Sequence, residues 1–95
     1  MKLFDIPNNT AVLTSWYVIH GGLPITEVLH EDDEEGGSFW QFHCGNGDYS
    51  MAKMMLVGLG TLLARDETLH EIADLEMGST ARRAARGMPW VIERP

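Results

Sequence analysis

The aromatic segment within residues 38–44 constrains the fold of this chain more than any other feature. Aromatic side chains favour β-strands, and successive residues of a strand point to opposite faces of a sheet. Trp40 and Phe42 therefore share one face, whereas Gln41 and His43 share the other. We expect the Trp40 face to be buried in the core. The Gln41 face either meets solvent or a partner, or is covered by the C-terminal helices.

The chain has 95 residues, which leave room for a single core. A chain of this length buries about 60–68% of the surface that its unfolded form exposes, so we expect one domain over residues 1–95. Hydrophobic residues make up 44% of the sequence, which supports a packed interior and argues against disorder.

Neighbouring segments predict the rest of the sheet. β-branched and aromatic residues predict a strand over residues 10–19, and residues 25–31 predict a second strand. The acidic and glycine-rich residues before 38–44 predict a hairpin with a long loop. The apolar residues 51–63 fit either a helix throughout or a strand that enters a helix, and we favour a strand at 53–57.

Short helices are expected after this strand, at residues 60–65, 68–75 and 79–85. Thr68 and Glu71 have the spacing of a capping box, and Ser79 is expected to cap the third helix. Residues 90–93 return as a short edge strand or pack against the sheet. The predicted fold class is therefore α+β, an antiparallel sheet of three to five strands with two or three short helices packed on one face.

Acidic residues dominate the charge of the chain. The formal net charge is −7, and one contiguous run consists of Glu31, Asp32, Asp33, Glu34 and Glu35. Because nucleic acids and anionic membranes attract Lys and Arg, this balance argues against both as partners. An acidic surface favours fast encounter with a basic protein instead.

The remaining sequence features point to the cytoplasm. Cys44 is the only cysteine, so no internal disulfide can form and a reducing compartment fits. The first residues lack the apolar run of a signal peptide, and no segment reaches the roughly 18 apolar residues of a membrane span.

No recognisable catalytic, metal or cofactor motif occurs. The four histidines have no recognised ligand spacing, and His43 and Cys44 point to opposite faces of one predicted strand. The acidic run is contiguous, whereas a calcium loop needs alternating carboxylates. The three tryptophans Trp16, Trp40 and Trp90 are expected in the core.

Basic residues gather near the C-terminus. Arg82, Arg83, Arg86 and Arg94 are four of the seven basic residues of the chain. We expect them to stabilise helix ends, and an anion site is the alternative.

Several segments together resemble one protein family. They are Pro24-Ile25-Thr26, Val28, His30, Trp40-Gln41-Phe42, Gly45, Arg65-Asp66, Leu69, Ala73-Asp74-Leu75, Gly78, Ala81, Arg83, Gly87 and Pro89-Trp90. The chain resembles a small bacterial domain family of unknown function that is related to the predicted immunity proteins of bacterial toxin–immunity systems. The resemblance runs from about residue 13 to residue 90 and implies a protein that neutralises a toxin.

The sequence therefore predicts a non-enzymatic protein-binding domain. In the first hypothesis, an acidic surface occludes the active site of a basic toxin, with contacts from Gln41, His43 and the five acidic residues Glu31, Asp32, Asp33, Glu34 and Glu35. The alternative is an interaction module or a homodimer without a toxin partner. A third hypothesis, a small-ligand or enzyme domain, requires two of His20, His30 and His43 to converge in one pocket.

Overall fold

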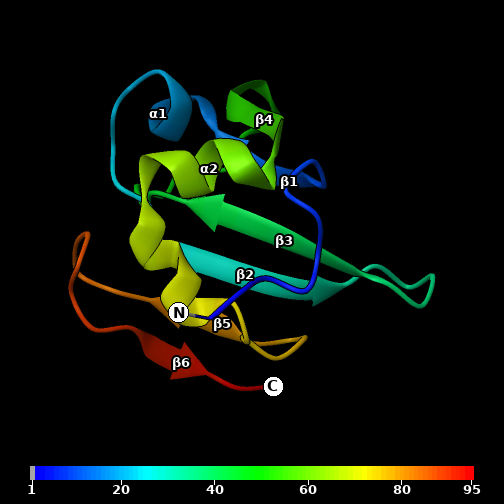
Figure 1. Cartoon of the computed structure of the whole chain (residues 1–95). Coiled ribbons are helices and arrows are strands. Elements are labelled where there is room, and N and C mark those ends of the chain that lie inside the picture. Colours follow the sequence, from blue (N-terminus) through cyan, green and yellow to red (C-terminus); the bar gives the residue numbers. More distant parts are fainter. Residues whose placement is uncertain (1) are drawn as a thin grey trace.

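A computed structural model describes residues 2–95 of the chain. Within these residues, six strands form one mixed sheet in the order β4-β1-β3-β2-β5-β6 (Figure 1). The strands are β1 (Ala11–Ser15), β2 (Glu27–Asp32), β3 (Ser38–His43), β4 (Met54–Gly58), β5 (Thr80–Arg82) and β6 (Val91–Glu93). The α+β class is thereby confirmed, but the sheet has more strands than the three to five expected.

The sequence predicted an antiparallel sheet, and this prediction is wrong for one pair of strands, because β1 and β3 are parallel. The other neighbouring strands are antiparallel. β2 and β3 form the predicted hairpin, so β3 runs opposite to β2 and in the same direction as β1. Figure 1 shows β3 in the middle of the sheet, between β1 and β2.

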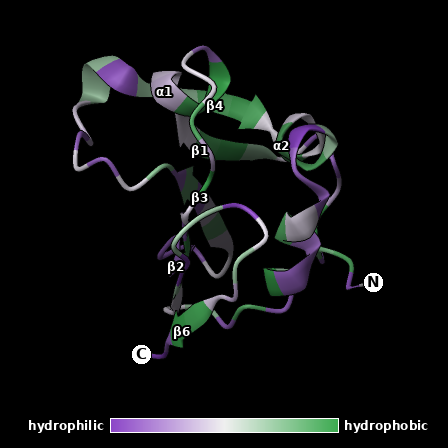
Figure 2. Ribbon diagram, turned by 90° about the vertical axis from the view of Figure 1, so that its left-hand side faces the viewer, coloured by the Kyte–Doolittle hydropathy of each residue, from purple (hydrophilic) through white to green (hydrophobic). Residues whose placement is uncertain are grey.

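Short helices accompany the sheet. They are α1 (Trp16–Ile19), the 3₁₀ helix η1 (Met51–Lys53), α2 (Leu59–Arg65) and the 3₁₀ helix η2 (Glu67–Ile72). Figure 2 shows α2 to one side of the strands. No helix of residues 2–95 has the length and apolar character needed to cross a membrane.

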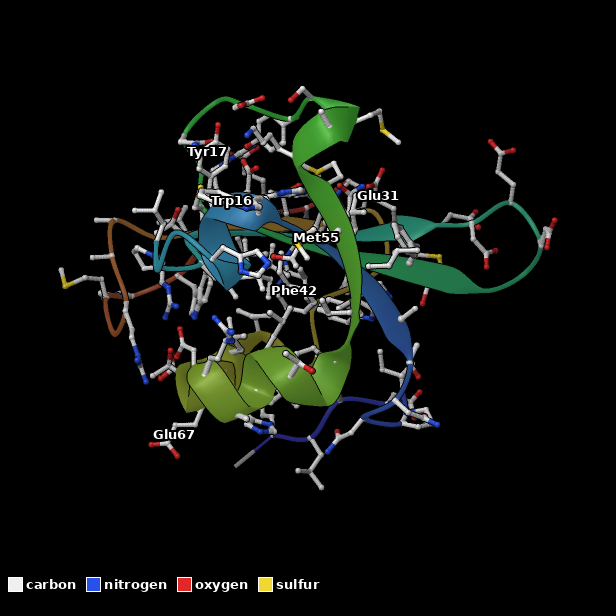
Figure 3. The ribbon with its side chains drawn as sticks, turned by 90° about the horizontal axis from the view of Figure 1, so that it is seen from above. Trp16, Tyr17, Glu31, Phe42, Met55 and Glu67 are labelled. Atoms are coloured by element: carbon white, nitrogen blue, oxygen red, sulfur yellow. The ribbon has the colours of Figure 1, made fainter. Side chains whose placement is uncertain are left out.

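The core lies between the sheet and the layer formed by α2 and η2. Trp40 and Phe42 are buried, which confirms the prediction for their face of β3. Figure 3 shows Phe42 on the side of the sheet that faces α2, whereas Glu31 lies on the other side. The other buried apolar residues are Val12, Val18, Ile25, Val28, Leu59, Leu62, Leu69, Ile72, Ala73, Leu75 and Ala81.

The predicted strand over residues 10–19 is correct in its first half and wrong in its second. Ser15 has an extended backbone and its hydroxyl accepts a hydrogen bond from the amide of Val18, so α1 begins directly after it. The turn exposes Trp16, whose relative exposure is 44%, and the prediction that Trp16 belongs to the core is wrong.

The start of η2 also differs from the prediction. Asp66 is the N-cap, because its Oδ1 accepts hydrogen bonds from the amide and the hydroxyl of Thr68. Thr68 therefore acts as a donor, and the expected capping box between Thr68 and Glu71 does not form. The segment is a 3₁₀ helix that ends at Ile72 and is shorter than the predicted helix over residues 68–75.

The predicted helix over residues 79–85 is wrong. Residues Thr80–Arg82 form β5, which pairs with β2 and buries Ala81 completely opposite Val28. Hydrogen bonds to β2 and burial of Ala81 override the local preference of this alanine- and arginine-rich segment for a helix. The return of the chain as an edge strand at β6 is confirmed.

Arg83 joins three separate parts of the fold. Its side chain is fully buried, and Nε and Nη2 both donate to the carbonyl of Ile25, at 3.0 and 2.9 Å. Nη2 also donates to Asp66 Oδ2 at 2.7 Å, and Nη1 donates to the hydroxyl of Thr68 at 2.8 Å. The guanidinium carbon lies 4.1 Å from the centre of the Trp90 ring. Arg83 therefore holds the chain before β2, the start of η2 and the C-terminal segment together.

The C-terminal arginines do not form one basic patch, nor do they end a helix. Besides the buried pair of Arg83 with Asp66, Arg82 pairs with Glu27 and Glu93, and Arg94 pairs with Glu76. Arg86 lies 3.4 Å from the second oxygen of Asp66. Each positive charge is therefore matched by a nearby carboxylate, and the expected helix-end role is wrong.

Candidate binding surface on the open sheet face

The face of the sheet opposite Trp40 and Phe42 is named the open face. Strand alternation and register place on it a set of mostly polar side chains from three adjacent strands: Glu27, Leu29 and Glu31 of β2, Gln41 and His43 of β3, and Arg82 of β5. The helical layer of α2 and η2 lies on the other face, so these residues are free of it.

Glu27 is the most tightly held carboxylate of the open face. The hydroxyl of Tyr49 donates to its Oε1, and Arg82 Nε donates to its Oε2 at 2.9 Å. Burial opposes ionisation of this side chain, which is only 14% exposed, but the bonds from Tyr49 and Arg82 outweigh it and lower the pKa of Glu27. Burial and the hydrogen bond to Glu27 raise the pKa of Tyr49 to about 12. Glu27 is therefore an anion at neutral pH and Tyr49 a neutral donor.

His43 lies under the ring of Tyr49. The two rings meet edge to face with their centres 4.9 Å apart, and only 2% of His43 is exposed. Its Nε2 donates to the amide oxygen of Gln41 at 2.9 Å, and the amide nitrogen of Gln41 donates to Glu31. A line of hydrogen bonds therefore runs from His43 through Gln41 to Glu31, at the beginning of the acidic run.

Burial lowers the pKa of His43, although Glu27 and Glu31 favour its charged form. The unfolded chain takes up a proton at the usual pKa of about 6.5, whereas the folded chain does so only at lower pH. The free energy of unfolding is therefore expected to fall as the pH drops below about 6.5, and to level off below the folded pKa.

A His43→Gln variant tests this expectation. We expect it to flatten the pH dependence of unfolding between about pH 7 and pH 5, measured by urea denaturation. The exposed His20 supplies a matched control, and His20→Gln should keep the slope. A slope that persists unchanged in His43→Gln would contradict the role given to burial of His43.

The acidic loop, residues 31–35, comprises the last two residues of β2 and the first three residues of the connection to β3. Its two aspartates shape the loop, because Asp32 accepts from the amide of Glu34 and Asp33 accepts from the amides of Glu35 and Gly37. Glu34 has a positive φ of 68°. The side chains of Glu34 and Glu35 are exposed, so these two carboxylates are available to a partner.

The structure brings together only some of the residues that the sequence predicted as contacts. Glu31, Gln41 and His43 are joined by hydrogen bonds on the open face. The other four candidates, Asp32, Asp33, Glu34 and Glu35, extend from the end of β2 along the exposed hairpin loop. The predicted surface therefore has a hydrogen-bonded part on the sheet and an exposed acidic part beside it.

Sequence reasoning missed three residues of the open face. Glu27 alternates with Glu31 in β2, and this signal would have placed it on the same face as Gln41. Arg82 was missed because a helix was predicted at residues 79–85, where the chain forms a strand. Tyr49 was missed because it lies in a loop, whose sequence shows no periodicity. With these residues, an open hollow on the face is lined by Glu27, Leu29, Gln41, His43, Tyr49 and Arg82.

The other histidines lie elsewhere. His30 is on the core face, where its ring stacks on Trp40 with centres 4.0 Å apart and Nδ1 donates to the carbonyl of Leu75. His30 and His43 therefore lie on opposite faces of the sheet. His20 is in the first residues after α1, beside the ring of Trp16. Among residues 2–95, no three His, Cys, Asp or Glu side chains gather in a way that would hold a metal ion.

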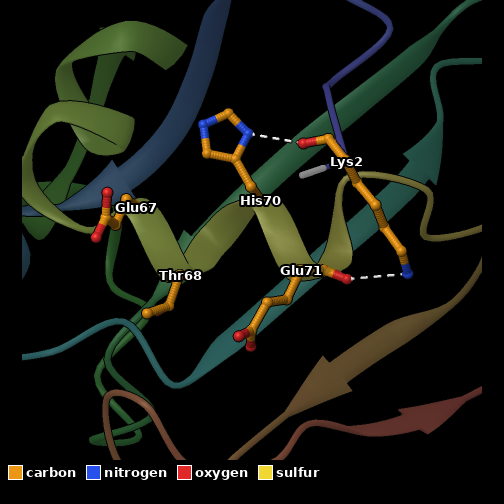
Figure 4. A pocket seen from close by; sticks show the side chains of 5 residues that line it. All are labelled: Lys2, Glu67, Thr68, His70 and Glu71. Atoms are coloured by element: carbon orange, nitrogen blue, oxygen red, sulfur yellow. Dashed lines mark hydrogen bonds between the residues drawn. The ribbon is translucent and has the colours of Figure 1, made fainter.

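A second hollow lies over η2 and is lined by Lys2, Glu67, Thr68, His70 and Glu71 (Figure 4). Lys2 Nζ donates to the carbonyl of Glu71 at 3.4 Å, and His70 Nδ1 donates to the carbonyl of Lys2 at 2.9 Å. These contacts attach the N-terminal segment to η2. They account for the arrangement of Lys2 and His70 in the fold.

No protein-family model matches the chain, and no curated protein and no solved structure is significantly similar to it. The resemblance to the immunity-protein family therefore stays a prediction from the residues named above.

Proposed function

We propose that the chain is a non-enzymatic protein-binding domain whose open face and acidic loop bind a basic partner protein. The observation that carries the proposal is the line of hydrogen bonds from His43 through Gln41 to Glu31, which joins the open face to the acidic loop. This line fixes polar groups of β2 and β3 next to the exposed carboxylates of Glu34 and Glu35. A preorganised polar surface beside an acidic loop fits a partner that carries Lys and Arg.

The charges of the open face support the same class of partner. Arg82 is paired with two carboxylates, Glu27 of the open face and Glu93 of the neighbouring strand β6, and Glu31 adds a third that bonds to the uncharged Gln41. Because burial lowers the pKa of His43, this ring adds little positive charge at neutral pH. The surface therefore carries net negative charge, which accelerates encounter with a basic protein. Added salt screens this attraction and slows the encounter.

Within this proposal, the family resemblance favours a toxin as the partner, neutralised by occlusion of its active site. The burial of His43 supports binding over catalysis, since its Nε2 donates to Gln41 and its ring is covered by Tyr49. A general base must reach the proton that it abstracts.

The test is binding to the purified product of the neighbouring gene, by calorimetry at low and moderate salt. We expect the double variant Glu34→Lys/Glu35→Lys to weaken binding at least about tenfold at low salt. This pair leaves Asp32 and Asp33, which shape the loop, unchanged.

The matched control is Glu67→Lys/Glu71→Lys, which makes the same change in net charge at two exposed positions of η2. It should leave the affinity within about threefold. If both double variants weakened the affinity equally, only the net charge of the chain would matter, and a defined binding surface on the open face would be contradicted.

A further inference from the structure

The outer edge of β4 lies apart from the open-face partner site and is open for pairing with another strand. Figure 3 looks down onto this edge, and no other segment of residues 2–95 is seen to cross it. β4 is the last strand of the sheet on this side, with β1 as its one neighbour. Unpaired edge strands present a row of backbone donors and acceptors to any strand that can reach them.

The hydrogen-bond pattern identifies the groups that face outward. The amide of Leu59 donates to the carbonyl of Thr10, directly beyond the last β1–β4 partners. Bonded and non-bonded pairs alternate in antiparallel strands, so the backbone groups of Val57 and Met55 bond to β1. The amide and carbonyl of Leu56 therefore point away from β1, outward from the edge of the sheet. The carbonyl of Met54 and the amide of Gly58 point the same way, whereas the amide of Met54 donates to Met51.

The side chains of β4 carry none of the features that usually prevent edge pairing. Met54–Gly58 contains no charge and no proline, and five successive residues pair with β1 without a bulge. Leu56 is 65% exposed. Lys53, the nearest cation, lies over the ring of Trp16 at 5.3 Å.

The opposite edge of the sheet is protected. β6 has three residues, is flanked by Pro89 and Pro95, and carries Glu93 in an ion pair with Arg82. The two edges therefore differ in charge, length and proline content, although both contain apolar residues (Figure 2).

We propose that β4 pairs with β4 of a second copy of this chain to form a twofold-symmetric dimer. A twofold axis at Leu56 makes the two strands antiparallel, so that the amide and carbonyl of Leu56 bond to the same groups of its symmetry mate. The outward amide of Gly58 then meets the outward carbonyl of Met54. Each available donor finds an acceptor, and the two Leu56 side chains pack on the same sheet face.

The outward backbone groups favour a second copy as the occupant, because those of Met54, Leu56 and Gly58 are arranged symmetrically about Leu56 and so match the same groups of another copy. A chain with net charge −7 repels its own copy wherever acidic surfaces meet, and β4 is an uncharged strand that lets two copies approach. A basic partner, by contrast, is drawn to the acidic loop. This dimer does not depend on the proposed partner, because it uses a different part of the molecule.

The oligomeric state in a concentration series tests the proposal, with sedimentation velocity on the full chain as the measurement. We expect a reversible monomer–dimer equilibrium that Leu56→Lys shifts toward monomer at least about tenfold. Val91→Lys is the matched control, because Val91 is 66% exposed on the opposite edge, and it should shift the equilibrium by less than about threefold. A wild-type chain that stays monomeric at millimolar concentration, or equal effects of the two variants, would overturn the proposal.

Hydrogen exchange of the unmodified chain provides a second readout that needs no variant. The amides of Leu56 and Gly58 should exchange more slowly in concentrated than in dilute solution, whereas those of Met55 and Val57 serve as internal references. Concentration-independent exchange at Leu56 would count against the dimer even if the lysine variants failed to fold.

Discussion

Replacing Arg83 by alanine is expected to lower the free energy of unfolding by about 3–5 kcal/mol. The substitution leaves the buried carboxylate of Asp66 without its closest cation and removes both donors to the carbonyl of Ile25. Urea denaturation followed by tryptophan fluorescence measures the loss, and Trp90, which lies against Arg83, supplies a local probe.

The adjacent Arg82 is the control for this prediction. Its side chain is exposed and its ion pairs with Glu27 and Glu93 lie at the surface, so Arg82→Ala should cost much less than Arg83→Ala. The double variant Arg83→Met/Asp66→Leu removes both buried charges and should recover part of the loss. A loss from Arg83→Ala no larger than that from Arg82→Ala would show that the buried pair does not hold the C-terminal segment.

The second large effect is expected in the core, where Phe42→Ala should cost about 3–5 kcal/mol. Phe42 is fully buried, and its ring lies within 6.0 Å of the centre of Trp40 and 6.2 Å of Phe4. Truncation leaves a cavity at the middle strand of the sheet, which the neighbouring strands cannot close. Thermal or urea unfolding measures this loss.

Phe39 gives a matched control on the same strand. It is half-buried and faces the other side of the sheet, so Phe39→Ala should cost about 1 kcal/mol. Equal losses from the two phenylalanines would contradict the assignment of the Trp40 and Phe42 face to the core.

The elements that the sequence predicted well are those with strong local signals. Alternation in β3 placed Trp40 and Phe42 in the core and left Gln41 on the opposite face, and the acidic, glycine-rich residues marked the hairpin between β2 and β3. β4 and α2 also lie within about one residue of the predicted ranges. In these segments local pattern and tertiary packing agree.

The errors arose where distant residues decide the local structure. β5 forms because β2 offers a free edge, which no local pattern in residues 79–85 reveals. The parallel pairing of β1 with β3 depends on the order of strands in space, which single-strand patterns do not contain. Asp66 displaced Thr68 as the cap of η2 because its carboxylate also meets the buried guanidinium of Arg83.

The candidate binding surface could be predicted only in part, again because distant segments contribute to it. Gln41 and His43 follow from alternation alone, but the clamp on Glu27 requires Tyr49 from a loop and Arg82 from β5. The acidic run was visible in the sequence, whereas the use of Asp32 and Asp33 in shaping the loop depends on its backbone.

The partner-binding surface that we propose consists of the open face and the acidic loop. Its most direct test is amide chemical-shift mapping of the isotope-labelled chain during titration with the product of the neighbouring gene. We expect the perturbed amides to cluster at Glu31, Gln41, His43 and the loop residues Glu34 and Glu35. Perturbations that cluster instead on α2 and η2, on the far side of the sheet, would contradict this proposal.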